Sequence, residues 1–158
     1  VDSLLDIAKM ESGQLKLDRE PTHLNALASN VVIEMDSLAR ELDVTLAVDV
    51  PYNLPLLDVD SNQIERVLLN LVDNALKFTP ADGLVRLAAY PPGEGGAPPN
   101  HIRVEVSDTG PGIPDDQKER LFDRFTQIEG ARGRRRGTGL GLTFCRLAVE
   151  AHRGRIWI

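Results

Sequence analysis

The chain has 158 residues, of which 42% are apolar, 27% charged and 4% aromatic, a composition typical of one globular domain. A domain of this length buries roughly two-thirds of its surface on folding, so its core needs neither a metal nor a disulfide. Cys145 is the single cysteine, which excludes an internal disulfide and a cysteine-based zinc site. The 18 basic and 24 acidic residues give a formal net charge of −6, which argues against nucleic acid as a partner of the whole domain.

The start of the chain indicates a part of a longer protein. Val1 lies inside a helical pattern, with no initiator methionine and no signal peptide before it. No apolar run reaches the ~18 residues of a membrane span. We therefore expect a soluble, cytoplasmic segment that makes no contact with a membrane.

The first half of the chain predicts alternating helices and short strands. A helical pattern that begins upstream ends at residue 12, and residues 15–17 predict a short strand or a linker. Apolar residues at spacings of three and four predict an amphipathic helix over residues 24–42. Period-two alternation predicts a strand over residues 44–50, with which residues 54–57 are expected to pair.

The second half predicts a long helix over residues 61–79, capped by Asp60 with Gln63 as its partner. Further along we predict strands at 84–90 and 102–107 around a loop rich in Pro and Gly, a turn at 108–114, a short helix at 117–125, an Arg-rich loop at 126–137, a helix at 140–152 and the start of a strand at 155–158. The pattern indicates the α/β class. We expect a two-layer α/β sandwich with a mixed, mainly antiparallel sheet and three helices on one face.

The long helix carries a polar stripe beside its apolar face. Asn70, Asn74 and Lys77 lie roughly 100° around the helix from the apolar residues. Two amides one turn apart beside a lysine can offer oxygen ligands to a metal ion and a charge to an anion, and a carboxamide oxygen suits Mg²⁺. The alternative is a solvated polar face, since surface Asn and Lys are common.

Two glycine-containing turns follow. Asp108 ends a predicted strand and precedes Gly110 and Gly112, so the backbone there can approach a flat ligand while the carboxylate accepts from an exocyclic amine. The alternative is a simple strand terminator. Three alternating glycines then lead into the last helix, at positions 137, 139 and 141.

These three glycines predict a phosphate cradle, because their N–H groups and the helix N-terminus can face an anion. The loop is neither a Walker A loop nor a dinucleotide fingerprint, and a flexible hinge is the alternative. Arginines crowd just before it, at positions 132 and 134–136. We interpret them as local phosphate partners, with a nucleic-acid patch or a solvated loop as the other interpretations.

In this order the motifs resemble the catalytic, ATP-binding domain of bacterial sensor histidine kinases, in the superfamily that includes DNA gyrase, heat-shock chaperones and mismatch-repair ATPases. The matching segments are residues 70–80 (N box), 108–114 (first glycine box), 121–125 (F box) and 137–142 (second glycine box). Residues 4–13 are similar to the end of the family's dimerisation helix hairpin. The resemblance implies a Bergerat-type ATP-binding fold, with the hairpin ending at residue 13 and a catalytic domain over 14–158, truncated at the C-terminal sheet edge.

The resemblance also implies the cofactors, ATP and Mg²⁺, and the roles of single residues. Asn74 would ligate Mg²⁺, and Asn70, Lys77 and Arg136 would act catalytically beside the phosphates, Arg136 from an ATP lid at 126–136. Asp108 would accept a hydrogen bond from the adenine amino group. The other nucleotide contacts would be Gly110, Gly112 and Ile113 at the base and Gly137, Thr138, Gly139, Leu140, Gly141 and Leu142 at the phosphates, with Phe122 and Phe125 anchoring the lid.

Asn70 points to one branch of this superfamily. Where members hydrolyse ATP, a Glu at this position acts as general base toward water, and a neutral amide cannot do so. Our hypothesis is transfer of the γ-phosphoryl to a His on the protein's own dimerisation domain, in a homodimer, and then to an Asp of a response-regulator receiver domain. His23, His101 and His152 lie in no phosphoacceptor motif and are expected to be structural or surface residues. The alternatives are an anti-sigma-type serine kinase on the same fold and a non-catalytic nucleotide-sensing module.

Overall fold

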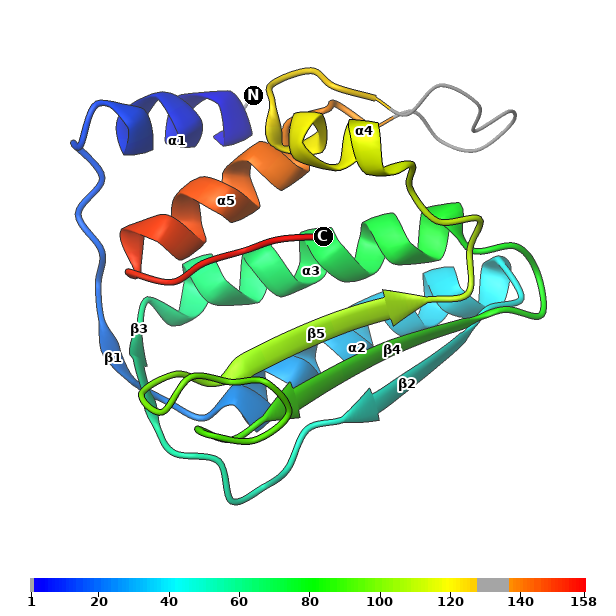
Figure 1. Ribbon diagram of the computed structural model, residues 1–158, viewed down its shortest axis with the longest axis horizontal. Helices are drawn as coiled ribbons and strands as arrows, with labels where there is room; N and C mark the ends of the chain where they lie inside the picture. The colour runs from blue at the N-terminus through cyan, green and yellow to red at the C-terminus, as the bar shows by residue number, and fades with distance from the viewer. Residues whose placement is uncertain (1, 128–136) are drawn as a thin grey trace.

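The computed structural model describes residues 2–127 and 137–158 (Figure 1). Its elements in chain order are α1 (Asp2–Glu11), β1 (Glu20–Thr22), α2 (Leu24–Glu41), β2 (Thr45–Asp49), β3 (Leu57–Val59), α3 (Ser61–Phe78), β4 (Leu84–Tyr90), β5 (Arg103–Asp108), α4 (Asp115–Lys118), the 3₁₀ helix η1 (Glu119–Phe122) and α5 (Gly141–Ala151). The predicted short helix over 117–125 is thus divided into α4 and η1. Among the described residues, no helix combines the length and the apolar character that crossing a membrane requires.

Two small sheets organise the strands. The main sheet has the order β2-β4-β5, in which β2 runs parallel to β4 and β5 runs antiparallel to it. A second sheet consists of β1 and β3, paired antiparallel. The predicted α/β class and the mixed sheet are therefore confirmed.

The partner predicted for residues 54–57 is wrong. β3 begins at Leu57 and pairs with β1, whereas β2 pairs with β4. Pro51 and Pro55 flank the connecting segment, and each lacks the N–H that a strand ladder needs. Leu54, between them, is instead buried in the core.

Two other segments have no regular structure. Residues 14–19 form a linker, the second of the two structures predicted near that position. The strand predicted at 155–158 is absent from the described structure, where no strand pairs with these residues. Figure 1 shows this C-terminal segment as an extended chain that runs along α3.

Helix α3 is the centre of the fold. It contacts α2, α5 and the strands β4 and β5, and Figure 1 shows it between the sheet on one side and α1 with α5 on the other. The apolar face of α3, built by the spacing of three and four residues, enters the main core. That core includes Leu24, Val31, Leu68, Val72, Leu76, Val85 and Leu87. Because this face is committed to packing, the polar stripe of α3 lies on its flank.

A second, smaller core joins α1, α3 and α5. Its buried residues are Ile7, Val67, Leu140, Phe144, Cys145 and Ala148. Ile7 is fully buried and the partly buried Met10 packs against the same cluster, so α1 packs onto the rest of the domain through its apolar face. Burial raises the pKa of the Cys145 thiol to about 12, because the interior disfavours a thiolate.

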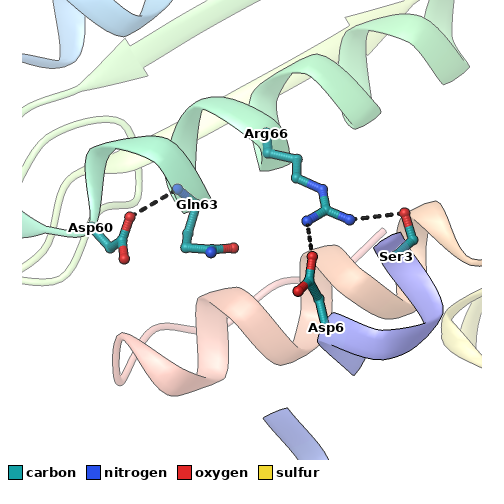
Figure 2. A network of polar contacts seen from close by, with 5 residues as sticks. All are labelled: Ser3, Asp6, Asp60, Gln63 and Arg66. Carbon is teal, nitrogen blue, oxygen red and sulfur yellow. Dashed lines mark hydrogen bonds and ion pairs between the residues drawn. The ribbon is translucent and has the colours of Figure 1, made fainter. Parts of the chain in front are cut away.

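The N-terminus of α3 is capped in a way that was only half predicted (Figure 2). Asp60 Oδ1 accepts a hydrogen bond from the Gln63 N–H at 3.1 Å, as expected. The return bond from the Gln63 side chain does not form, because the Asp60 N–H donates to His152 Nε2 at 3.0 Å. The buried Gln63 Oε1 accepts no hydrogen bond within the described structure. His152 thus has a structural role, which links the end of α5 to the start of α3.

Candidate nucleotide site

The polar flank of α3 carries three of the predicted site residues on successive turns. Asn70, Asn74 and Lys77 are all half-buried. The Lys77 Nζ donates to Asp73 Oδ2 at 2.5 Å, and the two side chains are 23% and 29% exposed. Asp73 was not among the residues predicted to act at the site, although opposite charges four residues apart on a helix commonly pair. The carboxylate holds the lysine ammonium against the helix.

The first glycine turn packs against the C-terminal end of α3. Asp108 is the last residue of β5, and its Oδ1 accepts the Gly110 N–H at 2.8 Å. A Cβ atom at Gly110 would lie 2.8 Å from the Phe78 carbonyl oxygen, so only glycine permits this approach. The Asp108 side chain is exposed, and a carboxylate can accept from an external donor through its second oxygen.

The second glycine motif reaches the same helix two turns earlier. Gly141 is the first residue of α5, and a Cβ atom there would lie 3.1 Å from Asn70 Oδ1. The N-terminus of α5 therefore contacts the amide of Asn70. Helix N-termini present free N–H groups and a positive partial charge, which suits an anion.

The two glycine motifs thus meet one helix at Phe78 and at Asn70. These residues are separated by eight positions, about 12 Å along the axis at about 1.5 Å per residue. Asn74 and Lys77 lie between them in sequence. The fold brings together three motifs that are far apart in the chain and places the amides and the lysine between an exposed carboxylate and a helix N-terminus.

The other predicted residues differ in their surroundings. Leu140 is buried, Ile113 and Leu142 are half-buried, and Gly137 and Thr138 are exposed. Gly112 has a left-handed φ of +77° and open space around it. Arg136 lies outside the described residues, as does the rest of 128–136.

The F-box residues hold the chain in two different ways. Phe122 is buried, and its carbonyl oxygen accepts from Thr143 Oγ1 at 2.9 Å. Phe125 is 63% exposed, so this residue is held by its backbone, whose N–H donates to the Gly139 carbonyl at 2.9 Å. Both contacts join the F box to the segment that contains the second glycine motif and α5.

An arginine connects α1 to this region, as Figure 2 shows. Arg66, one turn before Asn70 on α3, donates to Asp6 at 2.5 Å and to Ser3 at 2.8 Å. Its guanidinium carbon also lies 3.9 Å from the centre of the Phe144 ring on α5. No local pattern predicts such a contact, because the paired residues are 60 positions apart.

The donor set is compatible with a magnesium ion held mainly by a ligand. Among the described residues, no three His, Cys, Asp or Glu side chains cluster as a metal site. Mg²⁺ commonly keeps several waters and is bound by one or two protein oxygens together with phosphate oxygens. One carboxamide oxygen, from Asn74, fits that requirement.

Two hollows of the described surface, of about 500 and 210 Å³, lie beside the C-terminal residues 155–158. Neither is lined by Asn70, Asn74 or Lys77. Among the predicted nucleotide contacts, only Leu142 lines either of these two hollows, and Phe122 of the F box lines both. The candidate site therefore rests on the meeting of the motifs at α3.

Comparisons with known proteins agree with this geometry. A family model described as histidine kinase-, DNA gyrase B-, and HSP90-like ATPase matches residues 59–158. The chain is 38% identical over 158 residues to the sensor histidine kinase TmoS of Ectopseudomonas mendocina, a match that covers 99% of this chain and 16% of TmoS.

Solved structures of histidine kinases have the same fold. Full-length ShkA in complex with AMPPNP matches with a TM-score of 0.80 and 31% identity, over 95% of this chain and 30% of that chain. The histidine kinase ThkA in complex with the response regulator protein TrrA matches with a TM-score of 0.70 and 25% identity, over 99% of this chain and 43% of that chain. The resemblance in the four sequence motifs is confirmed: the chain belongs to the family of histidine kinase-, DNA gyrase B- and HSP90-like ATPases.

Proposed function

We propose that this chain is the ATP-binding catalytic domain of a two-component sensor histidine kinase. It binds Mg-ATP along α3 and transfers the γ-phosphoryl group to a His on the protein's dimerisation domain. The carrying observation is that both glycine motifs contact α3, at Phe78 and at Asn70, with Asn74 and Lys77 between them. The chain spans 16% of TmoS, so the activity of the whole protein is part of the proposal.

The adenine end of the site is assigned to the turn after β5. Asp108 accepts a hydrogen bond from the exocyclic amine, and the close packing of Gly110 on Phe78 leaves the base free to approach the backbone. Gly112 and Ile113 line the same end. This assignment is supported by the exposed Asp108 carboxylate and by the open space around Gly112 in the adjacent turn.

The phosphate end is assigned to the second glycine motif and the polar flank of α3. The N–H groups of residues 137–142 and the N-terminus of α5 face the phosphates, together with Asn70 and Lys77. Asn74 holds Mg²⁺ through its carboxamide oxygen. When bound, the ion neutralises charge on the phosphate oxygens. Arg136 is proposed to add positive charge there.

Asn70 determines which reaction this site performs. A neutral amide takes no proton from water, whereas an imidazole nitrogen needs no activated water because it is itself the nucleophile. The His nitrogen forms a bond to the γ-phosphorus while the bond to the β–γ bridging oxygen breaks and ADP leaves. The protein contributes positioning and charge neutralisation.

The proposed partners follow from the chemistry of transfer. The phosphoacceptor His lies on the dimerisation hairpin of a homodimer. Residues 1–13, which include α1, are the end of that hairpin, and residues 14–158 are the catalytic domain. A response-regulator receiver domain takes the phosphoryl group onto an Asp, as the named partner of ThkA suggests. We place the domain in the cytoplasm, where ATP is available.

The test is transfer in trans. The purified domain is mixed with a dimerisation hairpin that carries the phosphoacceptor His and with ATP labelled at the γ-phosphate. Acid-labile label on the His is expected, and Asp108→Asn should reduce it strongly, while the control Asp116→Asn, an exposed residue of α4, should not.

Other results would contradict the proposal. Acid-stable label on a Ser of a protein partner would favour a serine kinase of the anti-sigma type. Tight nucleotide binding with no label on any partner would favour a nucleotide-sensing module. Rapid ATP hydrolysis by the isolated domain would contradict the role assigned to Asn70.

A further inference from the structure

Residues 125–127, at the end of the F box, bind residues 137–139 of the second glycine motif through two hydrogen bonds, a contact that we call the clasp. The Gln127 side chain donates from Nε2 to the Gly137 carbonyl at 2.8 Å. Two residues earlier, the Phe125 N–H donates to the Gly139 carbonyl at 2.9 Å. Two donors separated by two positions thus bind two acceptors separated by two positions, so residues 125–127 run alongside residues 137–139.

The clasp holds both segments in unusual backbone conformations. Phe125 has a φ of +61°, a backbone conformation that residues other than glycine rarely adopt. The residue is 63% exposed, so burial of its side chain does not explain that conformation. Gly139 has a φ of +72°, and a Cβ atom there would lie 2.7 Å from the Phe125 Cα. The backbones of the two segments are therefore in close contact at Phe125 and Gly139.

The clasp determines which way two peptide groups face. The described peptide bonds are all trans, and in a trans peptide the N–H points opposite to the C=O. Because the carbonyls of Gly137 and Gly139 face residues 125–127, the N–H groups of Thr138 and Leu140 face away from that segment. The Leu140 N–H has a long contact of 3.4 Å to Thr138 Oγ1, beyond the usual range of a hydrogen bond.

We propose that Gln127 is a positioning residue for nucleotide binding. Its side-chain amide, with the Phe125 backbone, fixes the orientation of the 137–138 and 139–140 peptides so that the N–H groups of Thr138 and Leu140 face the phosphates. This proposal rests on the proposed function. The group that these N–H donors bind is the polyphosphate of a nucleoside diphosphate or triphosphate. An array of oriented N–H groups is a general device for binding such anions.

The chemistry of the side chain makes the proposal specific. The contact requires a donor at position 127, which a glutamine amide provides. Glutamate has the same shape but only acceptor oxygens, and methionine has a similar length and no donor. Either substitution leaves the 137–138 peptide free to rotate while most of the surrounding packing is kept, because Gln127 is exposed.

The test compares Gln127→Met and Gln127→Glu with wild type by calorimetric titration of Mg-ATP, ADP and adenosine. Both variants should raise the Kd for ATP and ADP about fivefold or more, which is the usual effect of one lost hydrogen bond. The Kd for adenosine should change less than twofold. The control Gln14→Met, at an exposed glutamine of the linker, should bind all three like wild type.

A second measurement reports on the clasp without nucleotide. Amide hydrogen exchange at residues 137–140 should be faster in Gln127→Met than in wild type, while exchange in α3 stays the same. Equal ATP affinity in wild type and both variants would overturn the role of Gln127 and leave the proposed function intact. An equal loss of affinity for adenosine would also overturn it, because the damage would then be general. If wild type itself binds neither ATP nor ADP, the proposed function fails, and this inference fails with it.

Discussion

Gly139→Ala should destabilise the domain far more than Gly112→Ala, although both glycines have left-handed φ angles, of +72° and +77°. Placing an L residue in that region costs about 1–2 kcal/mol. At Gly112 that is the whole expected cost, because nothing lies within 4 Å of the added Cβ.

At Gly139 the added Cβ would lie 2.7 Å from the Cα of Phe125 and 2.8 Å from its carbonyl carbon. Both are backbone atoms, so no side chain can rotate to relieve the contact and the two segments must separate. Overpacking of this kind costs about 1–3 kcal/mol. The expected loss for Gly139→Ala is therefore about 2–5 kcal/mol, against about 1–2 kcal/mol for Gly112→Ala.

Urea denaturation followed by circular dichroism measures this difference. With a slope of about 2 kcal/mol per molar urea, Gly112→Ala should lower the midpoint by about 0.5–1 M and Gly139→Ala by about 1–2.5 M. The slope itself should stay constant in both variants, since the folded and unfolded surfaces are unchanged. Equal midpoints for the two variants would show that the glycine loop and the Phe125 backbone are not in close contact, which would refute the reasoning.

Three other predictions concern charges and the buried thiol. Arg66→Met should loosen α1 and cost about 1–2 kcal/mol, because it removes both a partly buried ion pair and the guanidinium contact with the Phe144 ring. Faster amide exchange in residues 3–11 would confirm it, and unchanged exchange would contradict it. Asp73→Asn should tighten Mg-ATP binding about two- to fivefold at low salt, because it removes a negative charge beside Lys77; the control Asp36→Asn breaks the matched i,i+4 pair on α2 and should have no effect, and weaker binding in Asp73→Asn would contradict the assignment. The folded-state pKa of Cys145, about 12, exceeds its ordinary value of 9.0, so the unfolded chain loses the thiol proton first. The free energy of unfolding should therefore fall as pH rises from about 9 towards 12. In Cys145→Ala this thiol-dependent part of the decline should be absent, and an identical decline in the variant would contradict the prediction.

Sequence alone predicted the parts of the fold that depend on local periodicity. The apolar spacing in α2 and α3 and the alternation in β2 each predict an element without reference to the rest of the chain. The cap by Asp60 is also local, since its partner is the N–H of Gln63 three residues on.

Contacts between distant segments were not predictable in the same way. The pairing of β3 with β1 depends on a register across more than thirty residues, and no pattern inside three-residue strands encodes it. The Asp60 N–H was taken by His152, 92 residues away, which left Gln63 without its return bond. These outcomes depend on which groups the tertiary fold brings together.

The candidate site also has parts that local sequence patterns predict and parts that depend on tertiary contacts. Its motifs were recognisable because glycines, amides and a carboxylate at fixed spacing carry a chemical meaning by themselves. The pairing of Asp73 with Lys77 was accessible from the four-residue spacing. The clasp of Gln127 on Gly137 was not, because a glutamine in a loop has no characteristic pattern and its role depends on the backbone that lies opposite.

The central claim is that a nucleotide lies along α3 between the two glycine motifs, and backbone and side-chain amide NMR shifts during a titration with Mg-ATP test it most directly. The account predicts that the backbone amides of residues 108–110, 112–113 and 137–142 and the side-chain amide of Asn74 shift together, with one common Kd. Shifts confined to residues 118–123 and 155–158, beside the C-terminal hollows, would place the ligand elsewhere and contradict the account.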